Sequence, residues 1–93
     1  MRTIERTAQF KKDYKREKRS PRGKNLDKDL TIVLELLLKD LPLAAKYGDH
    51  PLSGEWKSFR DCHIRPDLIL IYRQHGSRVL QVVRLGSHSQ LSL

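Results

Sequence analysis

Cysteine and long apolar runs are scarce in this 93-residue sequence. The single cysteine, Cys62, excludes an internal disulfide framework and fits a reducing cytoplasm. No apolar run approaches the length that spans a membrane, and the N-terminus lacks the apolar core of a signal peptide. We therefore expect a cytoplasmic protein that is neither exported nor inserted into a membrane.

Metal-ligand motifs are absent as well. The four histidines lie in separate segments, and the sequence contains no HxxxH, HExxH or CxxC pair. Cys62 is next to His63, but neighbours on a strand point to opposite faces, so a buried thiol is favoured over a thiol nucleophile. We therefore expect no metal and no cofactor. A zinc site built from three histidines and an aspartate is the weaker alternative.

Positive charge is plentiful and unevenly placed. The formal net charge is +8, and residues 1–28 carry eleven Lys and Arg against four Asp and Glu, a net charge of +7. This asymmetry indicates a polyanion or an acidic protein as partner. A solvated helix face is the alternative, but charge this dense repels itself unless a partner neutralises it. The candidate RNA-binding residues are Lys11, Lys12, Lys15 and Arg16.

Local sequence patterns predict a short strand and two helices in the first half of the chain. Residues 2–6 are typical of a short strand. Thr7 is placed to cap a helix that runs to about Arg19, and its apolar face is too narrow to be stable without a packing partner. Residues 20–23 break this helix. Asn25 is then placed to cap a second helix, whose leucines recur at helical spacing and supply much of the core.

Three strands are predicted in the second half of the chain: residues 56–64, 68–74 and 79–85. The most apolar run, residues 68–72, is typical of a strand covered on both faces. Turn residues on both sides of the middle strand favour hairpin pairing with its two neighbours. The pattern predicts an α+β fold in one domain, residues 1–93, with two N-terminal helices packed on a mostly antiparallel sheet.

Side-chain parity places possible functional groups on one face of this sheet. Cys62 and Ile64 share one parity, and Asp61 and His63 share the other. If the apolar pair faces the helices, Asp61 and His63 face the open side of the sheet. Residues 86–93 are expected to form a flexible polar tail that carries one histidine.

These residue types suit the cleavage of RNA. The ribose 2′-OH attacks the adjacent phosphate, so a protein must supply only a base, an acid and cations. Histidine titrates near neutrality and can fill both proton-transfer roles. The candidates are His50, His63, Asp67 and His88 for catalysis and Lys57 and Arg60 for phosphate binding. Spacing alone is weak evidence, because any small protein with four histidines offers such a set. The remaining histidine, His75, lies in a predicted turn and is expected to have no role.

Four sequence blocks carry a resemblance to a known family. They are DHPL at residues 49–52, WKSFRDCHI at 56–64, PDLILIY at 66–72 and RLGSHSQL at 84–91. Together they closely resemble the YafQ branch of the RelE-type toxins of bacterial type II toxin–antitoxin modules. The resemblance extends over essentially the whole chain.

The resemblance implies a RelE-like fold and a ribosome-dependent mRNA endoribonuclease that needs no metal. The implied partners are the ribosome with its rRNA, the mRNA, and a cognate acidic antitoxin. The family's catalytic histidines and aspartate fall on His50, His63, Asp67 and His88. We expect His88 to act as general acid and His50 or Asp67 as general base. His63 and Arg60 are then expected to steady the phosphate.

Two positions depart from the family pattern. Leu68 stands where some relatives have tryptophan, and Ser92 and Leu93 stand where close relatives often have an aromatic residue. Either change is expected to weaken base stacking, alter codon preference or lower activity.

The alternative function is a basic nucleic-acid-binding module without catalysis, although such a module has no need for histidines gathered on one sheet.

Overall fold

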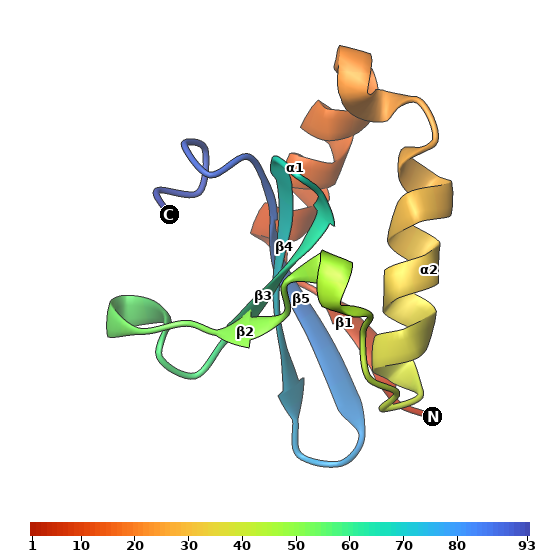
Figure 1. The fold of residues 1–93 in the computed structure, drawn as a ribbon, viewed down its shortest axis with the longest axis vertical. Coiled ribbons are helices and arrows are strands. Elements are labelled where there is room, and N and C mark those ends of the chain that lie inside the picture. The colour runs from red at the N-terminus through yellow and green to blue at the C-terminus, as the bar shows by residue number, and fades with distance from the viewer.

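Two helices cover one face of a five-stranded sheet (Figure 1). The computed structural model describes residues 1–93. The helices are α1 (Ala8–Arg19) and α2 (Leu26–Leu38), and neither is long and apolar enough to cross a membrane. The strands are β1 (Thr3–Arg6), β2 (His50–Pro51), β3 (Arg60–Arg65), β4 (Leu68–His75) and β5 (Val79–Gly86). Short 3-10 turns lie in the connections, namely η1 (Pro21–Gly23), η2 (Ala45–Tyr47) and η3 (Gly54–Trp56). The predicted α+β architecture is confirmed.

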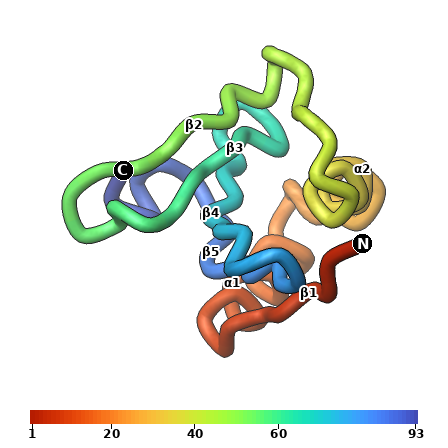
Figure 2. Tube along the Cα trace, turned by 90° about the horizontal axis from the view of Figure 1, so that it is seen from below, coloured from red at the N-terminus to blue at the C-terminus, as the bar shows by residue number.

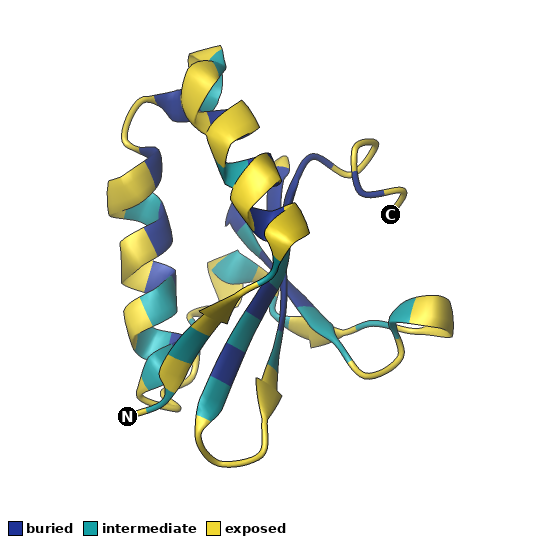
Figure 3. Ribbon diagram, turned by 180° about the vertical axis from the view of Figure 1, so that it is seen from behind, coloured by how far each residue is buried: buried dark blue, intermediate teal, exposed yellow.

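Strand β4 occupies the centre of the sheet, whose strand order is β1-β5-β4-β3-β2. It pairs antiparallel with β3 and β5, as predicted, while β1 lies parallel beside β5. All of residues 68–72 are buried (Figure 3). Leu68, Leu70 and Tyr72 belong to the helix-side core, and Ile69 and Ile71 belong to the cluster on the other face. The sheet is therefore mostly antiparallel, with one parallel pair at its β1 edge.

Helix α1 begins where the sequence predicts, but its buried face includes carboxylates as well as apolar side chains. The Thr7 hydroxyl oxygen accepts a hydrogen bond from the backbone N–H of Phe10 at 3.0 Å, as expected of an N-cap. Phe10 is buried and Tyr14 packs against the core, whereas Ala8 is exposed. The other buried residues of the helix are Asp13 and Glu17. A pattern of apolar residues cannot predict buried carboxylates, whose stability depends on cations elsewhere in the fold.

Helix α2 supplies the largest helical share of the core. Its buried residues are Leu26, Leu30, Val33 and Leu37, and they pack with the helix-facing side of the sheet. Asn25 stands at the predicted start, but its side chain makes no capping hydrogen bond. The expected cap is therefore wrong. Asn25 has a φ of 62°, a left-handed conformation that asparagine adopts more readily than most residues.

Strand β3 begins at Arg60, four residues later than predicted. Trp56 lies in the 3-10 turn η3, and its ring meets that of Phe59 edge-on, with the ring centroids 5.4 Å apart. Both aromatic residues pack against Ile69 and Ile71, on the sheet face opposite the helices. The segment between β2 and β3 therefore loops out to cover this face instead of extending the strand.

The C-terminal segment is folded against the sheet, which contradicts the expected flexible tail. Leu91 is 3% exposed and packs with Ile69 and Ile71, on the same side of the sheet as the loop that contains η3 (Figure 2). The Leu91 N–H also donates a hydrogen bond to the carbonyl oxygen of Ser87. Burial of the Leu91 side chain holds the C-terminal segment against the sheet. Hydrogen bonds within the turns of residues 87–93 define the path of the rest of the segment.

Candidate active site

Strand β3 places two polar residues on the sheet face opposite the helices. Cys62 and Ile64 belong to the helix-side core, so Asp61 and His63 point the other way, as predicted. The two-residue strand β2 brings His50 directly opposite Asp61 in an antiparallel pair. Cross-strand neighbours have Cβ atoms about 4.5–5.5 Å apart, close enough for their side chains to interact.

The ring of His50 is oriented by the backbone of its own loop. Its Nδ1 lies 2.8 Å from the carbonyl oxygen of Gly48 and 3.0 Å from Oδ1 of Asp61. A carbonyl oxygen can only accept a hydrogen bond, so the contact with Gly48 requires the hydrogen to be on Nδ1. Neutral His50 then has its lone pair on Nε2, facing away from this anchor.

Asp61 lies beneath the histidines as a buried carboxylate, and its part in the site was not predicted. It is 4% exposed, and its Oδ1 has no hydrogen-bond partner even though the His50 ring is near. Burial raises the pKa of Asp61, although the nearby His50, His63 and His88 act to lower it. The alternation of β3 predicted that Asp61 lies on the same face as His63. The burial of Asp61 was not predicted, because it depends on the pairing of β3 with β2.

Asp67 and His88 form a second pair at the same end of the sheet. His88 Nδ1 lies 2.9 Å from Oδ1 of Asp67, and the His88 backbone N–H donates to the same oxygen at 3.2 Å. These hydrogen bonds lower the pKa of Asp67 below its ordinary value. Asp67 is therefore ionised at neutral pH, and it lies well placed to stabilise a protonated His88.

His63 completes the cluster between these two pairs. Its ring centroid is 5.4 Å from that of His88. On its other side, a Cβ added to Gly48 would lie 3.1 Å from His63 Nδ1, and Gly48 has a φ of +55°. Glycine at position 48 thus serves both a left-handed backbone and the close approach of the ring. The four predicted catalytic residues gather with Asp61 in one cluster, which we call the histidine cluster.

Comparison with known proteins identifies the family. A family model described as "Bacterial toxin of type II toxin-antitoxin system, YafQ" matches residues 2–93. The chain belongs to the YafQ toxin family. The mRNA interferase toxin YafQ of Escherichia coli strain K12 is 41% identical over 90 residues, which cover 97% of this chain and 95% of that protein.

Solved structures of a YafQ toxin and of a second bacterial toxin share the fold. In a crystal structure of the E. coli DinJ–YafQ complex, the matching chain has a TM-score of 0.83 and 40% identity, covering 98% of both chains. A metal-bound toxin from Helicobacter pylori matches with a TM-score of 0.84 and 46% identity, covering 98% of this chain and 99% of that one. In the present structure, no group of three or more His, Cys, Asp and Glu side chains is arranged to hold a metal ion.

The two predicted phosphate-binding residues lie outside the histidine cluster of this YafQ-family chain. Arg60 shares the parity of Cys62, so its side chain lies on the helix side of the sheet, where it pairs with Asp49 at 3.2 Å. The Tyr72 hydroxyl donates to the same aspartate. Lys57 is exposed next to η3. The expectation that Arg60 joins His63 at a phosphate is corrected by this geometry.

The predicted RNA-binding residues divide into two groups. Lys11, Lys12 and Lys15 are exposed on α1 and take part in no ion pair of the structure. Arg16 instead turns toward the fold, where its Nη1 lies 2.8 Å from Asp13 and its Nη2 donates to the carbonyl oxygen of Leu85 at 2.7 Å. Arg16 is therefore a structural residue, which the sequence alone did not distinguish from the neighbouring lysines.

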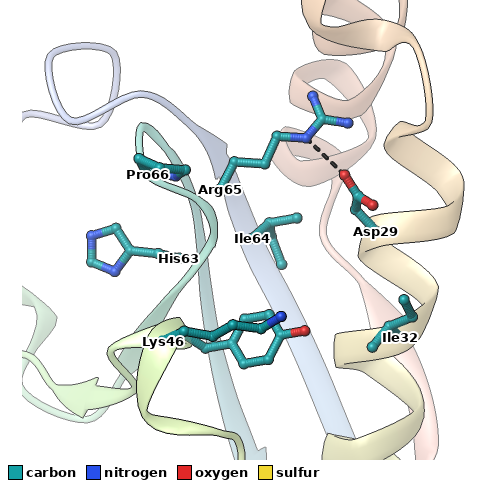
Figure 4. A pocket seen from close by; sticks show the side chains of 8 residues that line it. Asp29, Ile32, Lys46, His63, Ile64, Arg65 and Pro66 are labelled. Carbon is teal, nitrogen blue, oxygen red and sulfur yellow. Dashed lines mark hydrogen bonds and ion pairs between the residues drawn. The ribbon is translucent and has the colours of Figure 1, made fainter.

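A groove of about 600 Å³ adjoins the histidine cluster on the helix side (Figure 4). Helix α2 contributes Asp29 and Ile32 to it, while the ion pair between Arg65 and Asp29, at 2.8 Å, closes one end.

Leu68, the position that is tryptophan in some relatives, is fully buried in the helix-side core. A side chain at position 68 of this chain therefore packs in the core and does not face the histidines.

Proposed function

We propose that this protein is the toxin of a type II toxin–antitoxin module and that it cleaves mRNA on the ribosome. The supporting observation is the histidine cluster, in which three imidazoles and two carboxylates meet on one face of the sheet. A relative across nearly the whole chain is named an mRNA interferase toxin. The ribose 2′-OH serves as nucleophile, so the protein supplies proton transfer and charge stabilisation without a metal.

His50 is the proposed general base. Its Nδ1–H is held by the carbonyl oxygen of Gly48, which leaves Nε2 as an acceptor for the 2′-OH proton. Asp61 is close enough to stabilise the imidazolium that forms. Asp67, the other candidate base, is disfavoured because its lowered pKa makes it a weak proton acceptor and because it is bonded to His88.

His88 is the proposed general acid. Asp67 accepts the hydrogen bond of its Nδ1, so the Nε2–H of the protonated ring is free to protonate the leaving 5′-oxygen. A cation at this position also offsets the negative charge of the phosphorane. His63, next to His88, is placed to donate a hydrogen bond to a phosphate oxygen. This division gives each histidine of the cluster a separate role.

The exposed lysines of α1 are the proposed contact with rRNA. A surface of net positive charge docks on phosphates and is sensitive to salt. A cognate antitoxin blocks the toxin when bound, as expected from the complex that a YafQ relative forms with DinJ. The basic net charge favours an acidic antitoxin segment. Since the substrate is mRNA on the ribosome, we place the protein in the cytoplasm.

Cleavage of mRNA on programmed ribosomes tests this function. Alanine variants at His50, His63, Asp67 and His88 are compared with His75→Ala, which changes an exposed histidine at the end of β4. We expect about 10²–10⁴-fold slower cleavage for loss of the general acid or base, and a normal rate for His75→Ala. The wild type should be indifferent to a chelator that removes transition metals but leaves Mg²⁺ for the ribosome. A nucleic-acid-binding module would bind RNA without cleaving it in any variant.

A further inference from the structure

Helix α1 and the C-terminal turn are joined by a polar bridge that the cleavage chemistry does not use. Glu17 is 1% exposed and lies 2.6 Å from Nη2 of Arg22 and 3.1 Å from Nε of Arg16. A carboxylate this deeply buried is stable only while its cations stay in place. Arg22 is thereby fixed at the junction between η1 and the sheet.

Besides this ion pair, the Arg22 guanidinium makes two hydrogen bonds, and both lead toward the histidine cluster. Its Nη1 donates to the carbonyl oxygen of Asp67 at 2.8 Å, and its Nη2 donates to Oε1 of Gln90 at 3.3 Å. The same Gln90 oxygen accepts the backbone N–H of Ser87 at 2.8 Å. We call Glu17, Arg22 and Gln90 the brace.

Gly86 leaves space for two side chains that lie close to its backbone, namely Gln90 of the brace and Arg16. A Cβ at this position would lie 2.8 Å from Nη2 of Arg16 and 2.9 Å from Oε1 of Gln90. Separations below 3.0 Å would force one of these groups to move. The glycine at the end of β5 therefore allows the two side chains to cross its backbone.

The brace anchors the two backbone segments that carry the Asp67–His88 pair. One anchor is the carbonyl of Asp67 itself, and the other is the N–H of Ser87, directly before His88. The side chains of Asp67 and His88 are 66% and 49% exposed. Surrounding side chains thus do little to hold them, so their relative position depends on the backbone on either side.

We propose that Arg22 and Gln90 are positioning residues, which hold Asp67 and His88 at the geometry that proton transfer needs. This inference rests on the proposed function of His88 as general acid. Misplacement of a catalytic group by about 1 Å can cost about 10²-fold in rate. The Gln90 side chain makes its hydrogen bonds to Arg16, Arg22 and the Ser87 N–H, and none to His88. Its removal is therefore expected to act through the backbone that carries the pair, so the loss should disappear when His88 is already absent.

The test compares Gln90 variants in single-turnover cleavage on saturating amounts of programmed ribosomes. We expect Gln90→Ala to slow cleavage by about 10–100-fold. Gln90→Glu keeps an oxygen acceptor for Ser87 and Arg22 and should stay within about threefold of wild type. Gln74→Ala is the matched control, because Gln74 also makes side-chain hydrogen bonds, to Leu37 and Asp40, but near the turn at the far end of β4. It should cleave normally.

A double-mutant cycle shows whether the effect passes through His88. In the His88→Ala background, Gln90→Ala should cause no further loss, since coupled residues are not additive. Arg22→Lys, which keeps the charge but cannot donate from two guanidinium nitrogens, supplies a second variant should Gln90→Ala fail to fold, and we expect the same pattern. Melting temperatures establish that each variant is folded.

The outcomes separate this inference from the proposed function. A normal rate for Gln90→Ala, with His88→Ala impaired, would overturn the positioning role and leave the proposed acid in place. An equal loss in both backgrounds would also overturn it, because Gln90 would then act elsewhere. Full activity of His88→Ala would instead contradict the proposed function itself.

Discussion

Replacing Asp13 with alanine should destabilise the protein strongly. Asp13 is fully buried and accepts hydrogen bonds from Arg84 at 2.7 and 3.3 Å, from Arg16 at 2.8 Å, from Gln9 at 3.2 Å and from the Leu85 N–H at 3.1 Å. Breaking a buried ion pair by removing one partner costs about 3–5 kcal/mol. Here the Leu85 N–H and the largely buried Arg84 would lose the acceptor that offsets their desolvation. For a domain of this size, that loss lowers the melting temperature by about 15–25 °C.

The pH dependence of this loss follows from the direction of the pKa shift. Burial alone would raise the pKa of Asp13, but the hydrogen bonds that it accepts, led by those from Arg84, lower it below the ordinary value of 3.8. Stability from a carboxylate with a lowered pKa is present above that ordinary value and is lost as pH falls through the folded-state pKa. The difference between wild type and Asp13→Ala should therefore be full at neutral pH and shrink below about pH 4.

Urea unfolding across this pH range measures both effects. Asp27→Ala is the matched control, because Asp27 pairs with Lys18 at 2.7 Å on the exposed side of the helices, where solvent screens the charges. It should change stability little. If Asp13→Ala unfolds at nearly the wild-type urea concentration at pH 7, the claim that this carboxylate joins α1 to β5 is wrong.

Two further changes test the surface and the histidine cluster. Reversing Lys11, Lys12 and Lys15 to glutamate should weaken ribosome binding. The slope of log K for binding against log salt concentration should become shallower by about 1 for each phosphate that the variant no longer binds. Binding that keeps its wild-type salt slope would refute the proposed rRNA contact. Gly48→Ala should slow cleavage, because its Cβ would meet His63, and Gly76→Ala is the control, since it has a φ of +61° with nothing within 4 Å of an added Cβ. Both substitutions carry a backbone strain of about 1–2 kcal/mol, so equal cleavage rates would show that the contact with His63 does not matter.

Local patterns predicted most of the fold. The strand at residues 68–72 is recognisable because five consecutive apolar residues require cover on both faces, and the structure buries all of them. The start of α1 follows from Thr7, whose hydroxyl caps the helix. Asp13 shows the limit of such patterns. Its burial depends on Arg84, which is 71 positions away, and no helical periodicity contains that information.

The candidate site was only partly predictable. Residue types and the family resemblance named the four residues that the structure gathers, but Asp61 was missed because its burial depends on pairing with the two residues of β2. The assignment of Arg60 to a phosphate could have been corrected from the sequence, since Arg60 shares the parity of Cys62 and not of His63. The inward turn of Arg16 required the fold, because its partners include the backbone of β5.

The central claim is that the mRNA's own 2′-OH performs the attack while His50 and His88 move protons. The most direct measurement is cleavage, on programmed ribosomes, of an mRNA with a single 2′-deoxy nucleotide on the 5′ side of the scissile bond. The account predicts no cleavage at that bond, and it predicts a 2′,3′-cyclic phosphate on the product of the unmodified message. Cleavage of the 2′-deoxy message at the wild-type rate would contradict the account, because a different nucleophile would then be at work.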